Sequence, residues 1–212
     1  MFKQALLPDT LRAIQLAAQV PELQRAYLAG GTALALHLGH RISMDLDFFT
    51  QDKFEAKILS QELRRHPEFK QEGRAWRTIW GWLDKTKFSL FYYEYSLLVE
   101  PGKFEGLRVA DKADIAAMKL EAIGDRGTRR DFVDLYFLAQ EYGLEKILEF
   151  YDRKYKVLEN KLYHLIRSLS YFEEADREEK LPQMLVESSW DEIKRFFEVE
   201  AKRLAKTKIL YI

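Results

Sequence analysis

Two aspartates, Asp45 and Asp47, alternate with large apolar residues in the segment SMDLDFF. Strict alternation predicts a strand that carries both carboxylates on one face and Met44, Leu46 and Phe48 on the other. Carboxylate oxygens this close together can share divalent cations, and Mg²⁺ prefers a few carboxylates supplemented by substrate phosphates and waters. The pair therefore predicts a site for Mg²⁺ or Mn²⁺, although a structural pair held by salt bridges is the alternative.

A glycine pair and a threonine, Gly30, Gly31 and Thr32, precede the aspartates. Glycines let the backbone approach a phosphate closely, and the first amides of the following helix attract anions. Thr32 is expected to cap that helix, which ends at Gly39, but a plain strand-to-helix turn would need the same glycines. A phosphate site beside a metal site predicts a nucleoside triphosphate whose α-phosphorus faces a metal-activated hydroxyl.

The composition excludes other classes of site. The 212 residues include no cysteine, so disulfides and cysteine-ligated zinc are excluded, and the four histidines lack metal-ligand spacing. Lysine plus arginine equals aspartate plus glutamate, so the overall basic charge of many nucleic-acid-binding proteins is missing. No window approaches the roughly 18 apolar residues of a membrane span, and the amino terminus does not resemble a signal peptide. We therefore expect a cytoplasmic protein with no membrane partner.

The elements around the motif predict an α/β half. Residues 5–25 have helical spacing, AYLAGG is expected to be a short strand, and a polar helix is predicted over 53–66. Two strands follow around a turn near Asp84 and Lys85. Their aromatic residues could stack a base, but packing within the sheet is the favoured interpretation. The aromatic residues concerned are Trp76, Trp80, Trp82, Phe88, Phe91, Tyr92 and Tyr93.

From Asp111 onward the periodicity becomes helical. One helix is expected to end at Gly124 or Gly127, and Thr128 and Asp131 are spaced as a capping box at the start of the next. More helices follow, with breaks predicted near Lys156, across 171–182 and before Trp190.

Buried charges are expected in this helical half. Lys119 lies among apolar residues, so its side chain either extends to solvent or reaches into a cleft. Asp131 and Asp134 are three positions apart in a strongly apolar helix and share one face of it. Buried carboxylates need partners, and the cations available are Lys119, Arg126 and Arg130.

The stretch GGTALALHLGHRISMDLDFF resembles the nucleotidyltransferase fold of the DNA polymerase beta superfamily, with Asp-x-Asp about a dozen residues after the glycines. It is most similar to the AbiEii/AbiGii nucleotidyltransferase toxin family, including Arg41 and Ser43 ahead of the aspartates. The segment DIAAMKLEAIGDRGTRRDFVDLYFL resembles that family's later motifs, although Arg130 stands where the family usually has lysine. The resemblance implies an α/β (α+β) fold with a small mixed sheet, in which residues 1–110 form the core and 111–212 are helical and complete the active-site cleft.

The resemblance also implies a function. The chain would transfer a nucleoside monophosphate from a triphosphate to a hydroxyl and release pyrophosphate, as the toxin of a toxin–antitoxin or phage-defence pair. The implied partners are the triphosphate, an RNA acceptor such as tRNA, and a cognate antitoxin. The alternatives are a small-molecule acceptor, as in antibiotic-modifying nucleotidyltransferases, and a non-catalytic nucleotide-binding protein.

The same resemblance assigns the site residues. Asp45 and Asp47 hold the metal, and Asp131 positions Lys119 or assists the incoming hydroxyl. Arg41 either binds phosphate or pairs with Asp47, and Ser43 either orients a phosphate oxygen or caps the start of the strand. The predicted nucleotide ligands are Gly30, Gly31, Thr32, Arg41, Ser43, Lys119, Arg126 and Arg130.

One expected residue is missing from the sequence. Enzymes of the superfamily generally add a third carboxylate from a neighbouring strand, but KFSLFYYEY has Ser89 near that position, on one face with Lys87, Phe91 and Tyr93. Glu94 falls on the opposite face. Unless a bulge re-aims Glu94 or the strand has other bounds, two protein carboxylates hold the metal, and the third negative group is missing or comes from Asp131.

Overall fold

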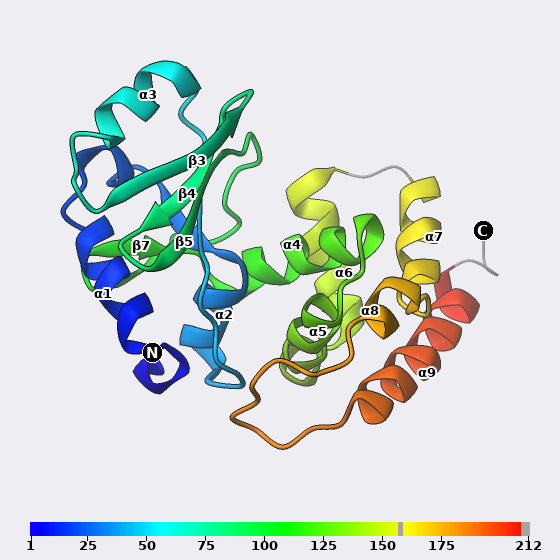
Figure 1. Cartoon of the computed structure of the whole chain (residues 1–212). Coiled ribbons are helices and arrows are strands. Elements are labelled where there is room, and N and C mark those ends of the chain that lie inside the picture. Colours follow the sequence, from blue (N-terminus) through cyan, green and yellow to red (C-terminus); the bar gives the residue numbers. More distant parts are fainter. Residues whose placement is uncertain (157–158, 209–212) are drawn as a thin grey trace. The chain divides into compact units, whose positions relative to one another are not determined.

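The structure is a computed structural model that describes residues 1–156 and 159–208. The chain forms two compact units, Met1–Asp111 and Lys112–Ile212 (Figure 1). The first contains a β-sheet, and the described part of the second consists of helices and their connections.

The first unit is built on a seven-stranded sheet in the order β3-β4-β5-β2-β1-β7-β6. β1 pairs with β7 and β2 pairs with β5 in parallel, whereas the other neighbours are antiparallel, so the prediction of a mixed sheet is confirmed. The sequence patterns did not reveal β3, which is largely polar, or the very short β6 and β7. The strands are β1 (Tyr27–Ala29), β2 (Leu46–Thr50), β3 (Phe69–Ala75), β4 (Thr78–Leu83), β5 (Thr86–Tyr92), β6 (Gly102–Phe104) and β7 (Leu107–Val109).

Two helices of the first unit are shorter than their sequence patterns indicate. The helix expected over 5–25 ends at Ala17, because Val20 precedes a proline and is extended, and Pro21 begins a separate 3₁₀ turn. The helix expected over 53–66 spans only Ala56–Leu63. The helical elements are η1 (Lys3–Ala5), α1 (Pro8–Ala17), η2 (Pro21–Leu23), α2 (Gly30–Leu38) and α3 (Ala56–Leu63).

One face of the sheet forms the core of this unit. Leu46 and Phe48 of β2 are fully buried, as are Ile79 and Leu90 of the neighbouring strands. α1 packs against β4 and β5, and α3 packs against β3 and β4. Asp47 lies between Leu46 and Phe48 in β2 and is only half-buried, so it belongs to the opposite face.

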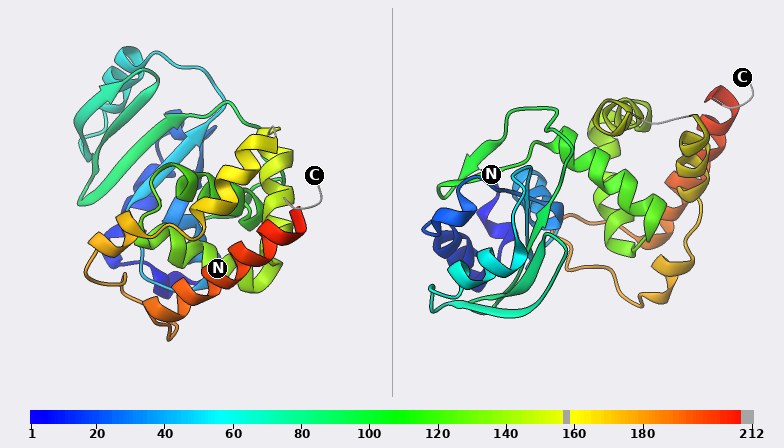
Figure 2. Two further views of the ribbon diagram at one scale, coloured as in Figure 1. Left: turned by 90° about the vertical axis from the view of Figure 1, so that its right-hand side faces the viewer. Right: turned by 90° about the horizontal axis from the view of Figure 1, so that it is seen from above.

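The described part of the second unit is helical (Figure 2). Four aromatic rings form a cluster within it. The ring of Phe132 lies 5.0 Å from that of Phe172, 5.3 Å from Phe197 and 6.0 Å from Trp190, measured between centroids. The predicted break near Lys156 is confirmed, since this residue is left-handed (φ 54°). The helices are α4 (Lys112–Asp125), α5 (Arg129–Tyr142), α6 (Leu144–Tyr155), α7 (Glu159–Ser168), α8 (Glu173–Arg177) and α9 (Trp190–Lys208). Among the helices of the described residues, none combines the length and the apolar character needed to cross a membrane.

Candidate active site

Two glycines at the end of β1 let side chains lie against the backbone. Gly30 has a φ of 65°, and a Cβ added to it would lie 3.0 Å from Oδ2 of Asp47. A Cβ added to Gly31 would overlap the guanidinium of Arg41 and lie 3.3 Å from Oγ of Ser43. The positive φ favours glycine at position 30, and the absence of a side chain at position 31 leaves room for the Arg41 guanidinium in its present position.

The Thr32 side chain does not cap α2, so that prediction is wrong. The helix begins at Gly30, Ala29 occupies the N-cap position, and no side chain of the described residues caps it. The buried Thr32 hydroxyl instead donates to the carbonyl oxygen of Asp45 and lies 2.9 Å from Oγ of Ser43. Thr32 thus ties the first turn of α2 to the segment that carries the aspartates, and the uncapped helix start presents amides of the kind that bind phosphate.

Arg41 and Ser43 are both buried beside this turn. Nη1 of Arg41 donates to the carbonyl oxygen of Ile42 at 3.1 Å, while Nη2 is the atom that a side chain at Gly31 would overlap. A buried guanidinium next to a glycine turn is well suited to an anionic ligand.

The aspartates stand at the start of β2. The strand begins at Leu46, so Asp45 immediately precedes it and Asp47 is its second residue; both are half-buried. Met44 is 57% exposed, which corrects the prediction that it shares the core face with Leu46 and Phe48. The alternation fails there because the chain before Leu46 is not part of the strand ladder.

The strand beside Asp47 presents a serine. β2 and β5 pair in parallel without interruption, and this register places Ser89 next to Asp47. β5 ends at Tyr92, so Glu94 lies beyond the strand and is exposed. Among the described residues, no group of three or more histidine, aspartate or glutamate side chains is arranged to hold a metal ion. The two aspartates and the serine hydroxyl fit a Mg²⁺ or Mn²⁺ ion that takes further oxygen ligands from substrate and water.

Lys119 is held by two carboxylates in the second unit. Its Nζ lies 3.0 Å from Oδ1 of Asp131 and 2.7 Å from Oδ2 of Asp134, and its side chain is 8% exposed. The spacing of the two aspartates on α5 places both on one face, as the sequence predicted. Of the two predicted positions for Lys119, extension to solvent is therefore wrong.

Asp131 is the centre of this network. Nε and Nη2 of Arg126 donate to it at 2.9 and 3.2 Å, and the Thr128 hydroxyl donates at 2.6 Å. Thr128 Oγ1 also accepts from the Asp131 amide at 3.4 Å, so the N-cap half of the predicted capping box is confirmed, while the Asp131 carboxylate accepts from the Thr128 hydroxyl. Burial alone would raise the pKa of Asp131, but the charge of Lys119 and the bonds from Arg126 and Thr128 hold that pKa well below its ordinary value.

The predicted residues thus fall into two sets, one in each unit. The first surrounds the turn between β1 and α2; the second is the Lys119 network, which also includes Asp134. Arg130 is exposed on α5, and Arg126 is the arginine that bonds to Asp131. The first set comprises Gly30, Gly31, Thr32, Arg41, Ser43, Asp45 and Asp47.

A second buried ion pair was not predicted. Nζ of Lys154 lies 2.6 Å from Oδ1 of Asp114, and both side chains are fully buried. Lys154 belongs to a basic run, DRKYK, which gives no sign that its middle residue points inward.

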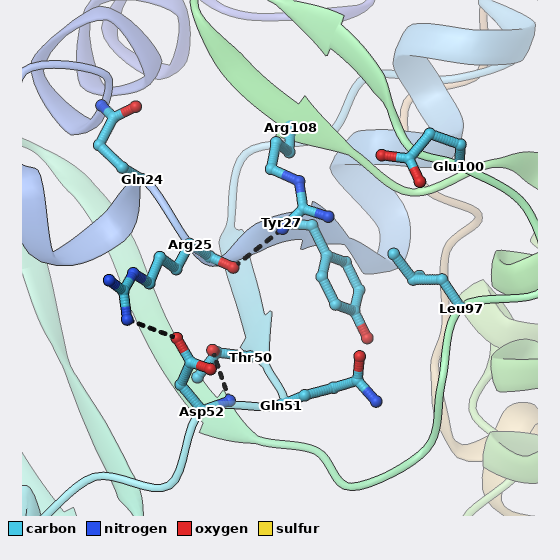
Figure 3. Close-up of a pocket in the computed structure, with 9 residues that line it drawn as sticks. All are labelled: Gln24, Arg25, Tyr27, Thr50, Gln51, Asp52, Leu97, Glu100 and Arg108. Atoms are coloured by element: carbon cyan, nitrogen blue, oxygen red, sulfur yellow. Dashed lines mark hydrogen bonds and ion pairs between the residues drawn. The ribbon is translucent and has the colours of Figure 1, made fainter.

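A polar pocket of about 500 Å³ lies where β1 begins, at Tyr27 (Figure 3). Arg25 pairs with Asp52 at 3.6 Å, and Nη1 of Arg108 donates to the carbonyl oxygen of Arg25 at 3.1 Å. The two arginines are balanced by Asp52 and Glu100 among the lining residues, so the pocket offers little net attraction for a triphosphate. Neither Asp45 nor Asp47 is among the residues that line it.

Comparisons with known proteins identify the family of the chain. The family model for the nucleotidyl transferase AbiEii toxin of type IV toxin–antitoxin systems matches residues 14–92 and 90–205. An uncharacterized protein of Aquifex aeolicus (strain VF5), aq_aa25, is 37% identical over 182 residues, which are 83% of this chain and 86% of that protein.

Two crystal structures from Helicobacter pylori share the fold. JHP933 superposes with a TM-score of 0.58 at 21% identity, covering 97% of this chain and 94% of that one. A protein described as a candidate nucleotidyltransferase superposes with a TM-score of 0.52 at 19% identity, covering 97% and 98%. At these identities the two structures establish a common fold.

Proposed function

The chain belongs to the AbiEii nucleotidyltransferase toxin family and is a nucleotidyltransferase, and from this premise we propose that it moves a nucleoside monophosphate from a triphosphate to a hydroxyl acceptor with the aid of Mg²⁺ or Mn²⁺. The observation that carries the proposal is the contact between the Gly30 turn and the Asp47 carboxylate. That contact joins a phosphate-binding turn to a metal-binding side chain.

The proposed reaction is a single displacement at the α-phosphorus. The acceptor oxygen forms a bond to that phosphorus, the bond to the β-phosphate oxygen breaks, pyrophosphate leaves, and the acceptor proton passes to solvent. Amides of the α2 start and the Arg41 guanidinium hold the β- and γ-phosphates and stabilise the charge of the leaving group. Asp45 and Asp47 would hold the cation, which when bound polarises the phosphoryl oxygen and activates the acceptor hydroxyl.

Lys119 and Asp131 are assigned to the same reaction by family resemblance. A carboxylate whose pKa is held this low is a weak base, and its oxygens already accept bonds from Lys119, Arg126 and Thr128. We therefore propose that Asp131 positions Lys119 rather than accepting the acceptor proton. Lys119 is proposed to bind the triphosphate, and the helical residues 111–212 are proposed to supply this part of the machinery.

The biological setting proposed for this activity is that of a toxin. The family description supports a toxin–antitoxin pair with an antitoxin protein as partner. We propose an RNA such as tRNA as the acceptor, and a cytoplasmic location, where nucleoside triphosphates and RNA are both present. A small hydroxyl compound would be the competing acceptor.

The proposal is tested by incubating the purified protein with each labelled nucleoside triphosphate, Mg²⁺ and total bacterial RNA. We expect label in RNA together with release of pyrophosphate, and neither product with the Asp47→Asn variant. Label in a small hydroxyl compound alone would replace RNA as the acceptor. If the protein binds nucleotide but releases no pyrophosphate with any of the four triphosphates, the proposed activity is refuted for this chain.

A further inference from the structure

A tryptophan lies in the same row of the sheet as the catalytic aspartate. The strand registers pair Ala29 with Asp47, Asp47 with Ser89, and Ser89 with Trp80. Residues directly opposite one another on paired strands project from the same face, so Trp80 shares its face with Asp47. Two strand spacings separate them, about 10 Å between backbones, and Ser89 between them has a short side chain.

The Trp80 indole is available to a ligand. It is 38% exposed, and it lies next to Gly73 of β3, where an added Cβ would overlap the ring. Within residues 1–156 and 159–208, the indole makes no ring contact, hydrogen bond or ion pair. Trp82, two residues along the same face, is different, because its Nε1 donates to Glu72 at 2.6 Å and Lys87 lies 5.9 Å from its ring.

The direction of the reaction indicates which substrate reaches Trp80. In phosphoryl transfer the attacking and leaving oxygens are roughly in line with the phosphorus. The Gly30 turn lies on the β1 side of Asp47, so pyrophosphate leaves toward β1 and the acceptor must approach from the β5 side. Trp80 of β4 lies on that acceptor side.

We propose that Trp80 stacks the nucleobase next to the attacking hydroxyl, and hence that the acceptor is an RNA end with unpaired bases. This inference rests on the proposed function and names the acceptor class for the same site. Indole rings stack every nucleobase, because each has a π-face. Lys87 is exposed on the same side and can contact an RNA phosphate, which a small hydroxyl compound would not offer.

The experiment compares acceptor and donor kinetics in matched variants. The acceptor is an RNA hairpin with a short unpaired 3′ tail, and the same hairpin without the tail is the control. Trp80→Ala should raise the KM for the tailed RNA by about 5-fold to about 150-fold, the range for loss of one stacked base, while nucleotide affinity measured without RNA stays unchanged. Trp80→Phe should restore most of the affinity. The control Trp76→Ala removes a tryptophan that is 77% exposed and lies outside this row. It should change neither the KM for the tailed RNA nor the nucleotide affinity.

Three outcomes would overturn the proposal: an unchanged KM for RNA in Trp80→Ala, a loss of nucleotide affinity instead, or equal use of both hairpins. Thermal melting of each variant identifies one that fails to fold, and if Trp80→Ala does so, the fluorescence comparison described next carries the test. If the wild-type protein transfers no label, the proposed function fails, and tryptophan fluorescence still tests the stacking. We expect the tailed hairpin to quench the tryptophan fluorescence of the wild type and of Trp76→Phe, but not that of Trp80→Phe. Equal quenching in the two variants would refute stacking on Trp80.

Discussion

Replacement of Lys119 by methionine should lower the stability of the second unit far more than replacement of an exposed lysine does. Lys119→Met keeps an unbranched side chain that is one heavy atom shorter, but it removes the cation between Asp131 and Asp134, which are themselves almost fully buried. Removing one partner of a buried ion pair leaves a charge in a poorly solvated place and costs about 3–5 kcal/mol. We therefore expect a loss of that size at neutral pH.

The same unit contains a matched control. Nζ of Lys161 lies 2.7 Å from Oε1 of Glu121, the same distance that separates Lys119 from Asp134, but the Lys161 side chain is 42% exposed. Ion pairs of that exposure contribute about 0–1 kcal/mol. Lys161→Met should therefore change the stability little, and the comparison isolates burial from distance.

Hydrogen–deuterium exchange of the α4 and α5 amides measures opening of this unit alone, which is preferable to a single unfolding temperature for a chain with two units. Exchange in Lys119→Met should be faster by about 100-fold or more, since each 1.4 kcal/mol is a factor of ten. Adding Asp134→Asn to Lys119→Met should recover part of the loss. Equal exchange in the Lys119 and Lys161 variants would refute the conclusion that Lys119 is a buried, paired cation.

Four further experiments each test one feature of the two units. Asp45→Asn or Asp47→Asn should slow label transfer by about 100-fold or more with an unchanged circular dichroism spectrum, because ligand charge is lost without emptying the core. Manganese titrated by electron paramagnetic resonance should show at most one weakly bound ion without nucleotide and tighter binding with it, because two carboxylates hold two divalent ions less firmly than three. Gly30→Ala should cost about 1–2 kcal/mol in thermal unfolding, since a side chain disfavours its positive φ. Asp131 has a lowered pKa in the folded chain, so its stabilisation is present above the unfolded value of about 3.9 and is lost as the pH falls below it. The acid dependence of the melting temperature should accordingly be weaker in Asp131→Asn.

Local patterns were sufficient to predict elements of both units. Alternation predicted β2, glycine at the left-handed position predicted the end of α2 at Gly39, and Thr128 predicted the start of α5. Each of these features depends on residues within a few positions of one another. Backbone conformation there is set by the residue itself and its neighbours, which a sequence displays directly.

Features that depend on distant partners were missed or misassigned. Thr32 has the residue type and position of a cap, but its hydroxyl donates to Asp45, 13 residues away. Lys154 looks like part of a solvated run, yet it pairs with Asp114 across 40 residues. The pattern of β4 favours packing of Trp80 within the sheet over base stacking, and only the register of β4, β5 and β2 places it in the row of Asp47. No periodicity encodes such pairings, because they are decided by tertiary contacts.

The charges of the two residue sets also differ in what they can do for a triphosphate. In the Lys119 network two cations, Lys119 and Arg126, face two anions, Asp131 and Asp134, so the four side chains sum to zero. A neutral network attracts a polyanion weakly beyond a Debye length, and Lys119 can contribute only through direct contact. The long-range attraction must then come from Arg41, the amides at the start of α2 and the bound cation. Raising the ionic strength should therefore weaken nucleotide affinity by nearly the same factor in Lys119→Met as in the wild type. In Arg41→Met the affinity should depend less on salt. If the salt dependence is lost in Lys119→Met instead, Lys119 contributes to the long-range attraction and this assignment of charges is wrong.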